Sequence, residues 1–115
     1  MVIKNAELPR EERQNMRGGK GCARLMHLCP AQDLPPNCRL ASVITLEKGA
    51  SIGTHDHVGE SEFYYILSGR GETVENGRTI PLLPGDVTLT GKGNAHDISN
   101  TGDEELVLLA VVITE

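Results

Sequence analysis

The sequence predicts an all-β fold, either a sandwich or a small barrel, for three reasons. Its 115 residues suit a single domain. Short apolar runs alternate with turns, in a chain that contains 13 glycines and six prolines. No amphipathic stretch is long enough for a substantial helix. Because aromatic residues make up only 3% of the chain, the core must be built from Val, Ile, Leu and Ala.

The first 21 residues are expected to form an N-terminal arm, with a short helical turn around residues 9–13. The turn Arg17–Gly21 looks like a phosphate-binding loop, but it lacks the spacing and the Ser or Thr of a Walker motif. We therefore predict a flexible turn, with a weak anion contact as the alternative. Residues 22–28 form the next expected strand, and we expect His27 to be an exposed or edge residue rather than a ligand.

The rest of the chain alternates between apolar runs and turns. Consecutive prolines place residues 31–38 in a loop, because proline cannot join a central ladder. The strands expected after this loop are RLASVITL, EFYYILS, the two halves of GETVENGRTIPL, DVTLT and LVLLAVVIT. Asn76-Gly77 is a strong signal for a hairpin. This makes seven or eight strands, and the last one is apolar enough that we expect both of its faces to be covered.

Charge and composition exclude several classes of protein. The net charge of −5 and the pI of about 5.3 argue against binding to nucleic acid or to a membrane through a basic patch. The N-terminus has no apolar signal region, and no apolar run approaches the ~18–20 residues that span a bilayer. The three cysteines have no C-x-x-C spacing, so they are expected to be reduced thiols in a cytoplasmic protein.

The stretch GTHDHVGESEFYYILSG, residues 53–69, contains the first candidate ligands. His55 and His57 are two residues apart, so in an extended chain they point to the same side. Glu62 at the start of the next strand can face the same interior, with Tyr64 and Ile66 beside it. The side chains of Phe63, Tyr65 and Leu67 are expected to face the other way.

A third imidazole comes from residues 84–100, where His96 follows two glycine-containing turns. Three neutral imidazoles and one carboxylate suit a first-row divalent metal, and the ligand set does not choose among Mn, Fe, Co, Ni and Zn. Open coordination positions would let substrate oxygens bind. Glu60 is a competing carboxylate, but its place in the loop 58–61 favours solvent.

These two stretches resemble the two motifs of the cupin family. In the first, G-x5-H-x-H-x4-E-x6-G, the matching residues are Gly49, His55, His57, Glu62 and Gly69. In the second, G-x5-P-x-G-x2-H-x3-N, the matching residues are Gly85, Gly93, His96 and Asn100. Gly91 stands where the motif has proline. We expect Gly91 to have a φ that proline tolerates, so that Gly91→Pro would stabilise the fold by roughly 0.4–1 kcal/mol. The alternative is a positive φ at Gly91, with which proline would lower both stability and metal content.

The resemblance implies a jelly-roll barrel of two antiparallel sheets, with residues 1–115 as a single cupin domain. The arm is 1–21, the first motif 49–69 and the second motif 85–100. The resemblance assigns metal ligation to His55, His57, Glu62 and His96, and makes Asn100 a supporting or turn residue. It also implies a homodimer, which we expect to use one sheet and the N-terminal segment.

The cupin family contains both enzymes and proteins that bind without turnover. We expect a metalloenzyme that acts on a small polar metabolite, such as a carboxylate, an enol or a hydroxy-ketone. Tyr64 is the candidate proton donor or orienting group, and core packing is its alternative role. The second hypothesis is a protein that binds or senses a small molecule through the metal, and the third is a structural role for the metal. The sequence does not distinguish an isomerase, oxygenase, lyase or decarboxylase.

Overall fold

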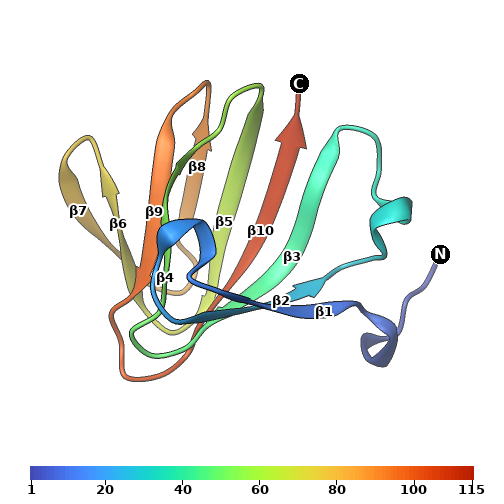
Figure 1. The fold of residues 1–115 in the computed structure, drawn as a ribbon, viewed down its shortest axis with the longest axis horizontal. Coiled ribbons are helices and arrows are strands. Elements are labelled where there is room, and N and C mark those ends of the chain that lie inside the picture. Colours follow the sequence, from blue (N-terminus) through green and yellow to red (C-terminus); the bar gives the residue numbers. More distant parts are fainter.

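The computed structural model describes all 115 residues as two antiparallel sheets, joined by loops and three short 3-10 turns (Figure 1). The six-stranded sheet has the order β1-β2-β3-β10-β5-β8, and the four-stranded sheet has the order β4-β9-β6-β7. The strands are β1 Arg10–Gln14, β2 Cys22–His27, β3 Cys38–Leu46, β4 Ser51–Asp56, β5 Glu60–Ser68, β6 Gly71–Glu75, β7 Arg78–Leu82, β8 Val87–Gly91, β9 Ala95–Asn100 and β10 Leu106–Thr114. The 3-10 turns are η1 Asn5–Glu7, η2 Met16–Gly18 and η3 Ala31–Asp33. None of these helical segments has the length and apolar character needed to cross a membrane.

The all-β prediction is confirmed, but the N-terminal segment differs from expectation. The helical turn expected around residues 9–13 is wrong: Arg10–Gln14 is an edge strand that pairs with β2 along its whole length. Every side chain of this strand is exposed, so backbone pairing holds it and no burial pattern marks it in the sequence. Its charged side chains also protect the edge of the sheet from further pairing.

The structure has ten strands rather than seven or eight. The additional strands are β1, β4 and β9. The last two are short and contain polar residues as well as apolar ones, which weakens the periodic signal of a strand. They are also the strands that contain His55 and His96.

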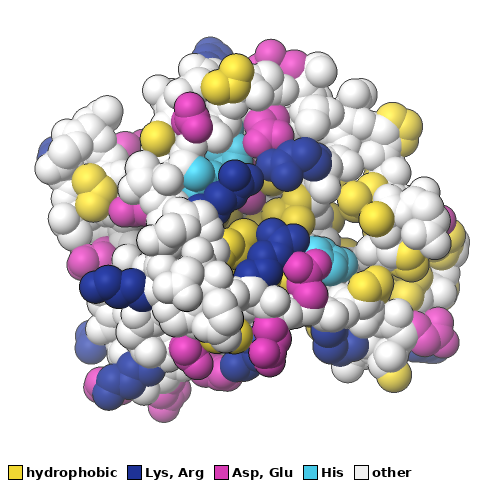
Figure 2. Space-filling view, viewed as in Figure 1, with side chains coloured by type: hydrophobic (Ala, Val, Ile, Leu, Met, Phe, Trp, Pro, Cys, Tyr) yellow, Lys and Arg dark blue, Asp and Glu magenta, His cyan; other side chains and the backbone are white.

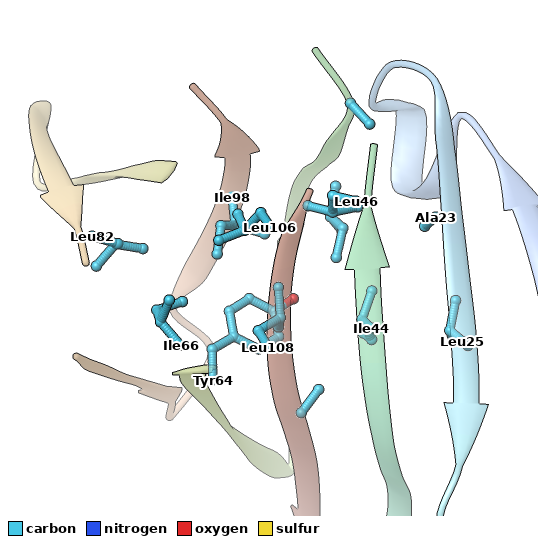
Figure 3. Close-up of a cluster of buried hydrophobic side chains, with 13 residues drawn as sticks. Ala23, Leu25, Ile44, Leu46, Tyr64, Ile66, Leu82, Ile98, Leu106 and Leu108 are labelled. Carbon is cyan, nitrogen blue, oxygen red and sulfur yellow. The ribbon is translucent and has the colours of Figure 1, made fainter. Parts of the chain in front are cut away.

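The core lies between the two sheets, where inward-facing aliphatic side chains meet (Figure 3). Tyr64 is the one aromatic ring in this cluster. The central strand β10 alternates between buried and half-exposed residues over most of its length. One face of β10 meets the opposite sheet, and the expectation that its other face is covered as well stays a prediction that concerns the assembly of two chains.

The β6–β7 hairpin and the alternation along β5 follow the sequence prediction. Asn76 and Gly77 both have positive φ, 52° and 74°, as a type I′ turn requires. On β5, Glu62, Tyr64 and Ile66 are buried. The side chains with the opposite phase, on the outer face of the sheet, are Phe63, Tyr65 and Leu67, which are 40%, 42% and 45% exposed.

Candidate metal centre

Four side chains from both sheets converge at one end of the interior. His55 lies on β4 and His96 on β9 of the four-stranded sheet, and the two residues are direct cross-strand partners. Glu62 comes from β5 of the six-stranded sheet, and His57 from the loop between β4 and β5. One ligand atom from each residue lies within 4.8 Å of the others, so the group could hold a metal ion.

A bulge in β4 aims His55 at this point. The pairing of β4 with β9 shifts between Ile52 and His55, where β4 has one extra residue. Because of this shift, Ile52 and His55 both face the interior although they are three residues apart. A bulge beside a functional site commonly re-aims one side chain in this way.

The distances show how tightly the group is packed. His96 Nε2 lies 2.8 Å from His57 Nε2, 2.9 Å from His55 Nε2 and 2.9 Å from Glu62 Oε1. The same carboxylate oxygen is 3.0 Å from His57 Nε2 and 3.7 Å from His55 Nε2. His57, Glu62 and His96 are all buried. Their ligand atoms therefore face one another rather than bulk water.

Hydrogen bonds on the far side of two rings fix which nitrogen carries the proton. His55 Nδ1 lies 2.7 Å from the carbonyl oxygen of Gly53, which can only accept, so Nδ1 donates and Nε2 keeps its lone pair. His57 Nδ1 donates in the same way to Glu60 Oε1 at 2.7 Å. Lone pairs and a carboxylate oxygen thus point at a common centre. That arrangement fits a divalent cation, which would offset their mutual repulsion.

The protonation of the other two residues agrees with this fit. Burial lowers the pKa of His96, despite the opposing charge of Glu62, which favours a neutral ring. Burial alone would raise the pKa of Glu62, but its interactions with His55 and His96 prevail and hold that pKa at about 2. The site therefore offers neutral imidazole and ionised carboxylate near neutral pH. The Nδ1 atom of His96 is buried without a hydrogen-bond partner.

Glu60 belongs to this site, and the expectation that it faces solvent is wrong. It is the first residue of β5, and its side chain is only 14% exposed. Besides accepting the hydrogen bond from His57, it accepts two from Arg39, from Nε and Nη2, both at 2.8 Å. The Arg39 hydrogen bond lowers the pKa of Glu60 to about 2 against the opposite effect of burial. In the sequence, only the spacing of three residues between His57 and Glu60 indicates that the two side chains could be in contact.

The second stretch is tied to the first through the backbone. The amide of His57 donates to the carbonyl of Asn94 at 3.0 Å, and the amide of Gly93 donates to the carbonyl of His57 at 2.7 Å. Lys92 and Gly93 take positive φ, 56° and 78°, whereas Gly91 does not. A Cβ at Gly91 would overlap the Oγ of Ser61 on the neighbouring strand. We therefore reverse the expectation that proline at position 91 would stabilise the fold.

Tyr64 packs against the histidine cluster. Its ring stacks on that of His96, with the centroids 4.7 Å apart and the planes 16° from parallel. Burial, and next the negative charge of Glu62, raise the pKa of Tyr64 well above its usual value, so the hydroxyl keeps its proton. The prediction that Tyr64 points inward is confirmed by its 2% exposure.

A cavity of about 360 Å³ adjoins the centre. Figure 2 shows Lys and Arg side chains around a hollow near the middle of this face, with histidine at its edges. The cavity is lined by His55, His57, Glu62 and Tyr64, by Arg13, Arg17 and Arg39, and by further residues that include His27. His27 is no part of the four-residue group: its Nδ1 lies 2.6 Å from Ser42 Oγ and its Nε2 lies 2.6 Å from Glu11 Oε2. It lies on β2 between β1 and β3, so it is not an edge residue.

Comparison with known proteins agrees with this geometry. The family model described as "Cupin domain" matches residues 42–112. An oxalate-binding protein of Thermotoga maritima is 42% identical over 113 residues, which cover 98% of this chain and 93% of that protein. The crystal structure of a predicted oxalate decarboxylase from Thermotoga maritima has a TM-score of 0.92 at 42% identity, over the whole of both chains. The structure of a polyketide cyclase from Streptomyces resistomycificus has a TM-score of 0.80 at 19% identity, over all of this chain and 80% of that one, and supports the fold alone.

Proposed function

This chain belongs to the cupin family, and on that premise we propose that residues 1–115 form one domain that binds a small carboxylate through a divalent metal. The proposed metal ligands are His55, His57, Glu62 and His96. The observation that carries the proposal is the convergence of three imidazole nitrogens and one buried carboxylate on a single centre. The likeness to an oxalate-binding protein across 98% of the chain supports oxalate, or a dicarboxylate of similar size, as the ligand.

The metal and the residues around it would have different roles in binding the ligand. A bound divalent metal would supply positive charge to the carboxylate oxygens of the ligand. Glu60 keeps His57 in the tautomer that leaves Nε2 free. Tyr64 lines the same cavity and carries its proton, so its hydroxyl can donate a hydrogen bond to a ligand oxygen. We propose Tyr64 as an orienting group for the ligand.

Metal binding is tested with protein purified without a histidine tag and analysed for metal content. His96→Ala should lose most of the bound metal. His27→Ala is the matched control, because His27 lines the same cavity but hydrogen-bonds to Ser42 and Glu11 instead of the cluster. Wild-type metal content in the His96 variant would refute the ligand assignment.

Ligand binding is tested by calorimetry with oxalate, using metal-loaded and metal-free protein. We expect heat of binding only from the loaded form, since the metal would hold the carboxylate oxygens. Oxalate affinity that is equal in the two forms would refute binding through the metal. Tyr64→Phe should weaken oxalate binding and leave the metal content unchanged.

A second candidate function is catalysis at the same centre, as an isomerase, oxygenase, lyase or decarboxylase. The observation that favours it is the protonated Tyr64 hydroxyl, which is placed to give a proton to a bound ligand. Metal-loaded protein should be incubated with small carboxylic, enol and hydroxy-keto acids and the products measured. Turnover that disappears in Tyr64→Phe would support an enzyme, and ligand-dependent thermal shifts without turnover would support a binding protein.

We also propose that the chain forms a homodimer through the outer face of the six-stranded sheet. On this face, Phe63 pairs across the strands with Leu89, and Tyr65 with Val87. Leu89 and Val87 are 59% and 56% exposed, so four large apolar side chains form one patch. A second copy is the simplest cover for such a patch. Light scattering should give twice the chain mass, and Leu89→Glu should give a monomer. A wild-type monomer at micromolar concentration would contradict the proposal.

We propose a reducing compartment, the cytoplasm, as the place where the chain works. Cys22, Cys29 and Cys38 are all free thiols in the fold, as is usual for proteins of such compartments. Thiol titration of protein isolated under alkylating conditions should find three free thiols per chain.

A further inference from the structure

The turn Arg17–Gly21, to which the sequence motifs assign no function, lies against β4, the strand that contains His55. In Figure 1 it is the blue turn over β4. Two glycines permit the close approach: a Cβ at Gly19 would overlap the carbonyl oxygen of Ser51, and a Cβ at Gly53 would overlap that of Arg17. The turn is therefore packed backbone to backbone on β4, not flexible as the sequence predicted.

Hydrogen bonds fix the turn in this position. The amide of Lys20 donates to Ser51 Oγ at 2.9 Å, and the amide of Ser51 donates to the carbonyl of Lys20 at 2.8 Å. The carbonyl of Arg17 lies against Gly53. The carbonyl of Gly53 in turn accepts the hydrogen bond from His55 Nδ1. The backbone of Arg17 and the ring of His55 are thus positioned by the same short segment of β4.

The backbone of Arg17 itself has an unusual conformation. Its φ is 54° and its ψ is 31°, in the left-handed region that residues other than glycine seldom occupy. Residues held in this region cluster at functional sites, where the surrounding structure fixes them. The close packing on β4 provides that constraint here.

Arg17 also differs from the other cationic side chains of the cavity in its partners. Arg13 pairs with Glu11, and Arg39 pairs with Glu60. Arg17 lines the same cavity as His55, His57, Glu62 and Tyr64, yet it makes neither an ion pair nor a side-chain hydrogen bond. Its guanidinium group is therefore free to bind an anion beside the proposed metal.

We propose that Arg17 binds the carboxylate oxygens of the ligand that the metal leaves free, and so selects a dicarboxylate over a monocarboxylate. This inference rests on the proposed function. A guanidinium group presents parallel N–H donors that match two carboxylate oxygens, and such charge-assisted pairs are stronger than neutral hydrogen bonds. A monocarboxylate bound to the metal has no second carboxylate to offer to Arg17.

The test uses manganese-loaded full-length protein and two probes, oxalate and formate, titrated by calorimetry. The test variants are Arg17→Gln, which removes the charge, and Arg17→Lys, which keeps the charge but not the planar fork. Arg13→Gln is the matched control, because Arg13 lines the same cavity but is already paired with Glu11. Manganese affinity and circular dichroism of every variant show whether the fold and the centre are intact.

We expect Arg17→Gln to weaken oxalate binding by roughly tenfold or more, as for the loss of a charged hydrogen-bonding group. Its formate and manganese affinities should stay near wild type, Arg17→Lys should be intermediate, and Arg13→Gln should bind oxalate normally. Unchanged oxalate affinity in Arg17→Gln overturns the inference while the proposed function stands. Equal loss of formate and oxalate overturns the selection of dicarboxylates, and loss of manganese shows a structural role instead. Failure of the wild type to bind oxalate refutes the proposed function and removes the premise.

Discussion

Replacing Glu60 by glutamine changes one atom of the carboxylate that supports His57, and we expect it to weaken metal binding strongly. In the wild type, Glu60 Oε1 accepts from His57 Nδ1 and from Arg39 Nη2, and Oε2 accepts from Arg39 Nε. Glutamine has only one acceptor oxygen for these three donors. If the amide nitrogen takes the place of Oε2, its N–H groups face the Nε–H of Arg39. If it takes the place of Oε1, they face His57 Nδ1.

The two orientations of the amide have different costs. If the NH2 group faces Arg39, donors oppose donors, and the side chain no longer holds its position. If it faces His57, Nδ1 must accept, so the proton moves to Nε2 and the ring cannot bind metal. Loss of a hydrogen-bond partner behind a histidine ligand typically costs ~10–100-fold in metal affinity. Because each orientation breaks a charged contact, we expect the upper half of that range, a loss of ~30–100-fold or roughly 2–2.7 kcal/mol.

The assay is competition with a chromophoric chelator, in which the dissociation constants of wild type and variant for the same divalent metal are compared. Glu12→Gln is the control, because Glu12 is an exposed glutamate outside the centre and its replacement makes the same change of charge. Near-UV and far-UV circular dichroism should show a folded variant. Metal affinity within a factor of two of wild type, in a folded Glu60→Gln protein, would refute the role assigned to Glu60.

Two further predictions concern acidity and packing. Hydrogen bonds from Arg13 on the same strand, and then from His27 on β2, lower the pKa of Glu11 from 4.5 to about 2, so these contacts stabilise the fold above pH 4.5 and are lost as the pH falls toward 2. A carboxyl NMR titration should find the low midpoint, and Arg13→Gln should raise it; a wild-type midpoint near 4.5 would contradict this. Gly91→Ala should lower the melting temperature because its Cβ overlaps Ser61 Oγ. In a double-mutant cycle Ser61→Gly should recover much of the loss, and an equally stable single variant would exclude the overlap.

The convergence of the four candidate ligands could be predicted because it depends on short-range rules. Alternation along a strand places Glu62 beside Tyr64, and the spacing of His55 and His57 puts both on one side. The family motif then adds His96 from a distant part of the chain. Each of these signals is contained in a few consecutive residues, which is why the meeting of the four candidate ligands inside the barrel could be predicted.

The surroundings of the centre could not be predicted in the same way, since they depend on pairing between distant segments. Glu60 looks like a loop residue until Arg39, 21 positions away, is placed beside it. The strand β1 has no buried side chain, so only its partner strand reveals it. The bulge before His55 appears only when β4 is aligned with β9.

The four candidate ligands come from both sheets, and this origin links metal occupancy to the mechanics of the barrel. Glu62 is anchored in the six-stranded sheet, while His55 and His96 are anchored in the four-stranded one. An ion bound by all of them would act as a cross-link at the end of the sandwich where the three imidazole rings meet the Glu62 carboxylate. At a free metal concentration of ~100 times the dissociation constant, such linkage would add about 2.7 kcal/mol to the free energy of unfolding. Removing the ion should then let β4 and β9 separate from β5 more readily than the apolar end opens, so that amide exchange would accelerate first around His55 and His96.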